Sequence, residues 1–307
     1  MTPQQQRIVK ANALIEASYR LSVAEQRVIL SVIAQLRRDE PISSTARYSV
    51  TANALADLSG VSAQRAYKEL ADAAQRIYRR EVRIVGGANG EVRSKVDGKP
   101  RVLMTRWVQA VEYIPGEGRV EIQFADPILP YLSDLKTHFT QYELANVAGM
   151  QSAYGIRLYE LLIQWRQAGE RELDLEWFRY ILGAEEKYKQ VKDLKKYVIE
   201  RAVQDVNEFS DLSVRVGYRK TGRRVSHVQF QFAPKKEQGQ PKAGQGKRSR
   251  ITEADIKAAA RPGERTEDVV RRLQEERDRK LQEQREAGKA EIRKLKEAMR
   301  GGRNPGG

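Results

Sequence analysis

The amino-acid sequence predicts an α+β fold, in which two tandem winged-helix domains are followed by a disordered or helical basic tail. A series of elements occurs twice in the same order: helix, short helix, turn, longer helix and β-hairpin, which is the order of a winged helix. A Pro-bounded break at residues 126–130 separates the two series, and the aromatic residues end at Phe232. We therefore expect a first winged helix over residues 1–132, a second over 133–232 and a tail over 233–307.

The first half of the chain contains the first series. Its expected elements are helices near residues 6–18 and 23–38, a strand over 47–51, a short helix ending at Gly60, a helix over 62–79, a strand over 81–85, a Gly-rich charged loop over 86–100, and strands near 101–114 and 119–124. Ser22-Val-Ala-Glu25 is a capping box, which satisfies two backbone N–H groups at a helix start. Gly60 falls where a helix has to reverse direction, which costs glycine little.

The second half repeats the series. Its expected elements are helices near residues 141–148 and 152–168, an extended stretch over 172–174, a short helix ending at Gly183, a long helix over 188–209 and a hairpin over 212–232. Thr140-Gln-Tyr-Glu143 has the pattern of a second capping box. Leu14, Leu21 and Val28 are spaced by seven, but the cap at Ser22 divides them between two helices, so we expect them in a domain core rather than in a leucine zipper.

The tail differs in composition from the rest of the chain. Its 75 residues contain 21 basic and 13 acidic side chains and no aromatic ring. Such a segment buries too little apolar surface to offset its ordering entropy, so we expect a disordered linker over 233–250. Beyond a capping box at Thr252-Glu-Ala-Asp255, the sequence over 264–300 predicts a marginal, solvated helix rather than a coiled coil.

The whole chain is strongly basic. Its 56 Lys and Arg residues exceed 41 Asp and Glu residues, which gives a formal net charge of +15. This charge favours a polyanionic partner, either nucleic acid or an anionic membrane surface. No run approaches the ~18 apolar residues that span a bilayer, and the N-terminus lacks the apolar region of a signal peptide. We therefore expect a cytoplasmic protein without a membrane partner.

Cysteine and histidine, which many metal sites and nucleophilic enzymes use, are scarce. There is no cysteine, and the two histidines, His138 and His227, lie far apart in the sequence. Cysteine-ligated metal is excluded, and a histidine metal site or a Ser-His-Asp triad has almost nothing to be built from. Gly246-Lys247 is followed by Arg248 and lacks the upstream glycine of a Walker A motif. We expect no enzyme activity, no catalytic residues, no cofactor and no metal.

The long helix of the second half has the pattern of a recognition helix. An apolar stripe on one side is formed by Val191, Leu194, Val198, Ala202 and Val206. The basic residues lie in the first two turns: Lys189, Lys192 and Lys196 opposite the stripe, and Lys195 at its edge. The N-terminal part of such a helix enters the major groove of DNA. A solvated charged face is the alternative for this helix taken alone.

The hairpin that follows favours contact with DNA. Arg219, Lys220, Arg223 and Arg224 surround a turn at Gly222, and no acidic residue occurs between positions 214 and 232. A wing of this kind lies against phosphates or the adjacent minor groove. His227 falls on the polar face of the hairpin and is included in the expected surface.

The first half repeats this arrangement more weakly. Its helix over 62–79 is expected to bury Tyr67, Leu70, Ala74 and Ile77, and to expose Gln64, Arg65, Lys68 and Arg76. The candidate wing over 86–100 mixes the basic Arg93, Lys95 and Lys99 with the acidic Glu91 and Asp97. Here we expect phosphate contacts or a protein interface rather than base readout.

Four segments carry a resemblance to a known family. Residues 14–30, 152–162, 193–196 and 227–230 resemble, in this order, the iteron-binding theta-type plasmid replication initiators (Rep proteins). The resemblance covers residues 7–232 and implies two winged helices. The second would read repeated origin sequences, the iterons, through Lys192, Lys195 and Lys196 on its recognition helix and Arg223 and Arg224 in its wing. The first would serve dimerisation and phosphate contacts.

The resemblance also implies partners. Monomers would bind iterons in double-stranded DNA and open the origin, dimers would repress the protein's own gene, and the chain would recruit the host initiator DnaA and the replicative helicase.

Two other functions stay open at this point. One is a winged-helix transcriptional regulator without a replication role, and the other is a protein-interaction scaffold whose charge serves only solubility.

Overall fold

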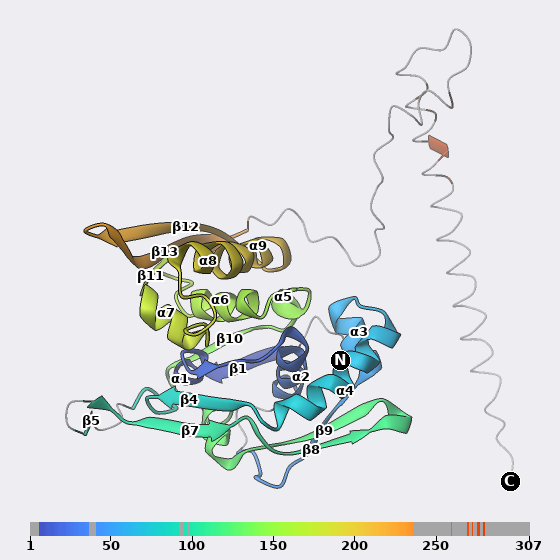
Figure 1. Ribbon diagram of the computed structural model, residues 1–307. Coiled ribbons are helices and arrows are strands. Elements are labelled where there is room, and N and C mark those ends of the chain that lie inside the picture. The colour runs from blue at the N-terminus through green and yellow to red at the C-terminus, as the bar shows by residue number, and fades with distance from the viewer. Residues whose placement is uncertain are drawn as a thin grey trace, which may run out of the picture. The chain divides into compact units, whose positions relative to one another are not determined.

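The computed structural model describes residues 6–36, 41–91, 95, 96 and 99–235, together with residues 259, 269, 272, 275, 276 and 279 (Figure 1). The chain divides into two units, residues 1–238 and 239–307, and the fold described below belongs to the first. Apart from residues 233–235 and the six isolated positions, the expected linker, capping box and helix of the tail lie outside the described residues.

The first half contains short helices and two three-stranded antiparallel sheets. In chain order its elements are β1 (Arg7–Ala11), α1 (Asn12–Ile15), β2 (Ser18–Tyr19), α2 (Val23–Ile33), β3 (Tyr48–Thr51), α3 (Ala52–Ser59), α4 (Ala63–Ile77), β4 (Glu81–Val85), β5 (Lys95–Val96), β6 (Lys99–Pro100), β7 (Val102–Arg106), β8 (Val108–Ile114), η2 (Pro115–Glu117), β9 (Arg119–Phe124) and η3 (Asp126–Tyr131). The sheets have the strand orders β3-β9-β8 and β2-β4-β7. The hairpin β8–β9 packs against α4, as the wing of a winged helix packs beside its recognition helix.

The second half forms one three-stranded sheet covered by helices. Its elements are β10 (Phe139–Glu143), α5 (Ala145–Ala148), α6 (Ala153–Ile163), β11 (Glu170–Asp174), α7 (Leu175–Ile181), α8 (Val191–Leu194), η4 (Lys195–Ile199), α9 (Glu200–Phe209), β12 (Leu212–Thr221) and β13 (Arg224–Pro234). The sheet order is β11-β13-β12, with both pairings antiparallel. The mixed helices and strands confirm the predicted fold class.

Local signals set several helix ends as predicted. Ser22 accepts from the Glu25 backbone N–H, and the Glu25 carboxylate accepts from the Ser22 N–H, so the capping box of α2 is complete. Gly60 ends α3 with φ of 68°, a left-handed conformation that favours glycine. Leu14, Leu21 and Val28 are all buried in the core, as expected for packing within a domain rather than for a zipper.

Two predicted helices are wrong at their first turns. The expected helix over 6–18 is the strand β1, the short helix α1 and the strand β2, and the expected helix over 141–148 begins as the strand β10. The cause is a long-range pairing, Arg7↔Glu143 through Ala11↔Phe139. Consequently Thr140 caps no helix: it lies in β10, where its hydroxyl donates to Asn12 Oδ1 at 2.7 Å.

The same pairing joins residues on the two sides of position 132, where we expect the first domain to end. The limits 1–132, 133–232 and 233–307 therefore stay a prediction.

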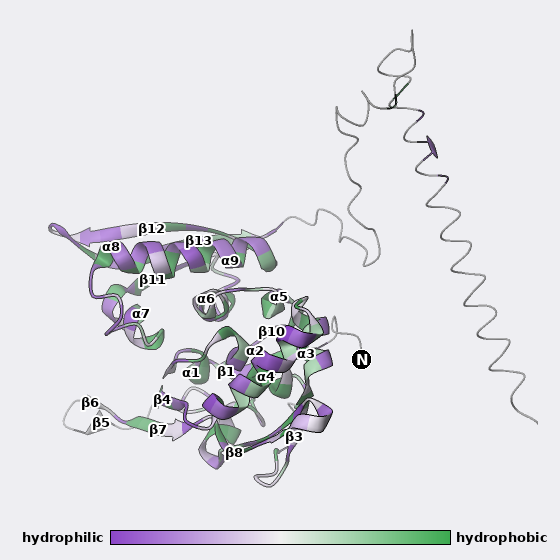
Figure 2. Cartoon of the chain, turned by 45° about the vertical axis from the view of Figure 1, so that its right-hand side comes forward, coloured by the Kyte–Doolittle hydropathy of each residue, from purple (hydrophilic) through white to green (hydrophobic). Residues whose placement is uncertain are grey.

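Apolar residues line the interior of both halves, whereas α8 and the outer part of β12 are hydrophilic (Figure 2). Among the described helices, none is long and apolar enough to cross a membrane.

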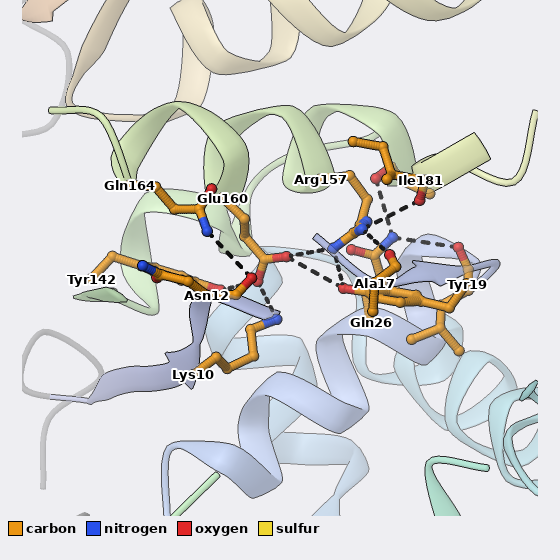
Figure 3. Close-up of polar contacts among 12 residues, drawn as sticks. Lys10, Asn12, Ala17, Tyr19, Gln26, Tyr142, Arg157, Glu160, Gln164 and Ile181 are labelled. Atoms are coloured by element: carbon orange, nitrogen blue, oxygen red, sulfur yellow. Dashed lines mark hydrogen bonds and ion pairs between the residues drawn. The ribbon is translucent and has the colours of Figure 1, made fainter. Parts of the chain in front are cut away.

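A buried polar network fixes α6 to the N-terminal strands (Figure 3). Glu160 on α6 forms ion pairs with Lys10 of β1 and with Arg157, whose Nη1 lies 3.3 Å from Glu160 Oε2. The Tyr142 hydroxyl donates to Glu160 Oε1 at 2.6 Å, and Arg157 also donates to the Ala17 carbonyl oxygen at 2.7 Å. Burial alone would raise the pKa of Glu160, but Lys10 and Arg157 outweigh it and hold that pKa below its usual range.

Candidate nucleic-acid interface

The long helix of the second half is continuous from α8 through η4 to α9. Leu194, Val198, Ala202 and Val206 are fully buried and Val191 is half-buried, so the predicted apolar stripe is confirmed. Lys192 and Lys196 are exposed on the side away from that stripe. The segment η4 is a π-helical turn, which holds about one residue more than an α-turn and is frequent at functional sites.

Lys189 lies just before this helix rather than in it, because α8 begins at Val191. Its side chain is exposed, and its carbonyl oxygen accepts from Arg179 Nη2 at 3.2 Å. Arg179, buried on α7, also donates to the carbonyl oxygen of Tyr188. These hydrogen bonds fix the backbone of Tyr188 and Lys189, which leads into the recognition helix, and so restrict the position from which the Lys189 side chain extends.

Lys195 and Lys196, the first two residues of the π-turn, have different surroundings. The Lys195 ammonium lies 3.6 Å from the centroid of the Tyr218 ring on β12, and its side chain is half-buried. The Lys196 ammonium lies 5.1 Å from the Tyr197 ring and is exposed. The helix therefore presents Lys192 and Lys196 to solvent and directs Lys195 toward the wing.

A group of tyrosines beside the helix was not predicted from the sequence. The rings of Tyr188 and Tyr197 stack with centroids 6.2 Å apart, and Tyr154 meets Tyr188 edge-on at 6.3 Å. Tyr197 is 51% exposed, and the Lys187 ammonium lies 5.3 Å from the Tyr188 ring. The only signal in the sequence was the presence of two tyrosines, Tyr188 and Tyr197, near the start of the predicted helix. Their spacing of nine residues matches no helix or strand period, so the sequence did not predict that the two rings stack.

The wing consists of β12, β13 and a turn in which Gly222 has φ of 62°. Lys220, Arg223 and Arg224 are exposed at this tip, and none of them forms an ion pair with another described residue. His227 is half-buried, and its Nδ1 lies 2.9 Å from the Ser226 hydroxyl. The tip thus carries three free cations, which phosphates can neutralise.

Arg219 is the exception in the wing. It forms a bidentate ion pair with Glu172 of β11, with Nη2–Oε1 and Nε–Oε2 distances of 2.6 and 3.0 Å. Hydrogen bonds from Arg219, chiefly, and from Gln229 lower the pKa of Glu172 to about 2. The hairpin sequence itself has no acid, but the sheet places the Glu172 carboxylate of β11 beside it.

The first half exposes the predicted polar face of α4. Gln64, Arg65, Lys68 and Arg76 are all exposed, but Arg65 pairs with Glu69 at 2.8 Å and Arg76 with Asp72 at 3.3 Å. Each pair lies one helical turn apart and reduces the charge available to DNA.

Tyr67 was expected to be buried but is 39% exposed, because the buried stripe of α4 runs through Ala66 and Leu70. Its hydroxyl donates to the carbonyl oxygen of Pro115 in the β8–β9 connection. In the expected wing over 86–100, Arg93 and Asp97 lie outside the described residues, as do the side chains of Lys95 and Lys99.

The candidate residues form two separate groups. Lys189, Lys192 and Lys196 lie on and before the helix at one end of the first unit, together with the wing, whereas α4 lies toward the other end (Figure 1). The arrangement can present a helix and a basic hairpin to one stretch of a polyanion and a second helix to another.

Comparison with known proteins identifies two matching family models. "Initiator Replication protein, WH1" matches residues 7–163, and "Initiator Rep protein, WH2" matches residues 174–232. An Escherichia coli "Replication initiation protein" is 27% identical over 231 residues, which cover 73% of this chain and 68% of the relative. The Escherichia coli "PI protein" is 23% identical over 246 residues, which cover 72% of this chain and 80% of the relative.

A solved structure has the same fold. The crystal structure of the Pi initiator protein in complex with iteron DNA superposes with a TM-score of 0.61 at 19% sequence identity. The superposition covers 76% of this chain and 99% of the other. The fold is therefore that of a protein with two winged helices.

Proposed function

Because this chain belongs to the initiator replication protein family, with its WH1 and WH2 domains, we propose that it initiates plasmid replication by binding iterons in double-stranded DNA. The observation that carries the proposal is the juxtaposition in the second half of a lysine-bearing helix with a wing whose tip has three cations that pair with no described carboxylate. The solved Pi initiator, which shares the fold, was crystallised with iteron DNA.

In the proposed complex the recognition helix enters the major groove. Lys192 and Lys196, exposed near its start, reach base edges or the flanking phosphates. Lys189 contacts a phosphate from the preceding loop. Lys220, Arg223 and Arg224 follow the backbone beside the groove, and His227 lies behind them on the strand. Arg219 takes a smaller part because Glu172 neutralises it.

The first half would contribute phosphate contacts through the exposed face of α4. Lys68 has no ion pair among the described residues, so it carries this role more than Arg65 and Arg76 do, and the exposed Gln64 amide can donate a hydrogen bond to a phosphate. Such contacts add affinity and fix the register on the duplex without reading its sequence.

We also propose that the first half forms the dimer. β7 is an edge strand, and the register Val85↔Val102 and Arg83↔Met104 places Val85, Val102 and Met104 on one face of β4 and β7. These side chains are 44%, 45% and 60% exposed. An exposed apolar patch beside an edge strand offers a surface on which a second copy can pack. Dimers would repress the chain's own gene, and monomers would open the origin and recruit DnaA and the replicative helicase.

Footprinting of the full chain on the DNA that flanks its gene tests the proposal. Protection of tandem direct repeats is the expected result, and protection of one isolated palindrome would support a transcriptional regulator instead. If no duplex is protected at moderate salt, the basic charge has no DNA-binding role. In parallel, the gene with its flanking DNA should support autonomous replication of a plasmid that lacks another origin.

A further inference from the structure

The contact between Lys195 and Tyr218 joins the two DNA-binding elements of the second half. Lys195 opens the π-turn of the recognition helix, and Tyr218 lies on β12, one residue before Arg219 at the base of the wing tip. The ammonium lies 3.6 Å from the ring centroid, well inside the range of about 6 Å over which a ring face attracts a cation. This is the shortest cation–ring distance among the lysines described.

The ring, and not the phenol hydroxyl, carries this contact. The Tyr218 hydroxyl is buried and has no hydrogen-bond partner among the described residues. Burial, with a smaller effect from the Glu200 carboxylate, raises the pKa of Tyr218 to about 12, so the phenol stays neutral at working pH. A neutral ring offers its face to Lys195 without an ion pair, and a phenylalanine could offer the same face.

Lys195 also differs from its neighbours in what restrains it. Lys192 and Lys196 are exposed, whereas Lys195 is half-buried between helix and strand. A free lysine loses much side-chain entropy when it is fixed on DNA, and a lysine already held loses less. Holding Lys195 therefore presets both the position of one cation and the separation of the helix from the wing.

We propose that Tyr218 is a positioning residue, whose ring holds the Lys195 ammonium between the recognition helix and the wing so that this cation meets a DNA phosphate or base from a preset position. The inference rests on the proposed function, since it concerns the same DNA-binding surface. It gives the sequence segment 212–221 a second role besides its place in the sheet.

The experiment uses the full chain and a labelled duplex carrying the sequence that footprinting finds protected. Binding is measured by fluorescence anisotropy over a salt series for the parent, Lys195→Met, Tyr218→Leu, Tyr218→Phe and the double variant Lys195→Met/Tyr218→Leu. Lys195→Met keeps the length of the side chain and removes its charge. Tyr218→Phe is the matched control, since it keeps the ring and removes only the unpartnered hydroxyl.

We expect Lys195→Met to weaken binding about 5- to 10-fold and to lower the log–log salt slope by about 0.9, the loss of one neutralised phosphate. Tyr218→Leu should weaken binding about 3- to 10-fold, and Tyr218→Phe should bind within about 2-fold of the parent. In the Lys195→Met background, Tyr218→Leu should have no further effect, because the two residues act as one unit.

Each result decides. Additive losses in the double variant, or parent-like binding by Lys195→Met, would overturn the positioning role while leaving the proposed function intact. Weak binding by Tyr218→Phe would assign the role to the hydroxyl and overturn the inference as well. If the parent protects no duplex, the proposed function itself fails. Should Tyr218→Leu lose its fold, as seen in a thermal melt, parent-like binding by Lys195→Met or weak binding by Tyr218→Phe would still overturn the inference.

Discussion

Arg219 on the wing strand and Glu172 on β11 form a bidentate ion pair across the sheet, although 47 residues separate them in the sequence. The Arg219 guanidinium, next to the basic tip on β12, is therefore already neutralised by a carboxylate. An initiator in which that carboxylate were absent would present a fourth cation to DNA.

Glu172→Gln should strengthen DNA binding. Releasing Arg219 adds one phosphate contact, so the log–log salt slope should steepen by about 0.9 and the affinity at low salt should rise. Anisotropy over a salt series measures both. Glu170→Gln is the matched control, since Glu170 lies on the same strand, carries the same charge and has no ion pair among the described residues. Equal effects of the two variants would show that only net charge matters.

The Glu172–Arg219 pair should survive mild acid. The pKa of Glu172 is lowered to about 2, so its carboxylate stays ionised down to that pH. A lowered acid pKa stabilises the folded chain above the ordinary glutamate value of about 4.3, and this contribution is lost as the pH falls through about 2. An NMR titration of the side-chain carboxyl carbon measures it. In Arg219→Gln the midpoint should move up toward the ordinary value, and an unchanged midpoint would contradict the assignment.

Glu160→Gln should destabilise the fold. The change leaves Lys10 and Arg157 buried without their shared carboxylate, and removing one partner of a buried ion pair costs about 3–5 kcal/mol. Urea unfolding at neutral pH measures the free energy of unfolding. Glu112→Gln is the control, because its pair with Arg47 is more than half exposed on both sides and should change stability by less than about 1 kcal/mol.

Lys196→Ala and Arg224→Ala should weaken DNA binding without changing the thermal midpoint, because both side chains are exposed. A base contact by Lys196 predicts a loss of about 1–3 kcal/mol on the specific duplex and a smaller loss on unrelated DNA. A phosphate contact by Arg224 predicts similar losses on both duplexes and a salt slope lower by about 0.9. Parent-like binding by both variants would move the interface elsewhere.

The sequence predicted those parts of the fold that local patterns determine. The cap at Ser22, the amphipathic helix α4, the apolar stripe from Leu194 to Val206 and the hairpin turn at Gly222 all depend on residues within a few positions of one another. The family resemblance depends on short local segments as well, residues 14–30, 152–162, 193–196 and 227–230, and on their order along the chain.

What the sequence could not predict depends on distant pairings. The local sequence of β1 predicts the start of a helix, and only its pairing with β10 makes it a strand. Glu172 becomes a neighbour of Arg219 only through the register of β11 on β13. The stacking of Tyr188 on Tyr197 depends likewise on how a loop returns to a helix. In each case the two residues have no periodic relationship in the sequence.

The pairing of β1 with β10 has a consequence for biosynthesis. The strand that pairs with Arg7–Ala11, Phe139–Glu143, is synthesised more than a hundred residues after it. At about 5–20 residues per second, the strand Arg7–Ala11 waits roughly 6–26 seconds for its partner. β1 therefore stays an open strand edge, accessible to chaperones, until β10 has been translated.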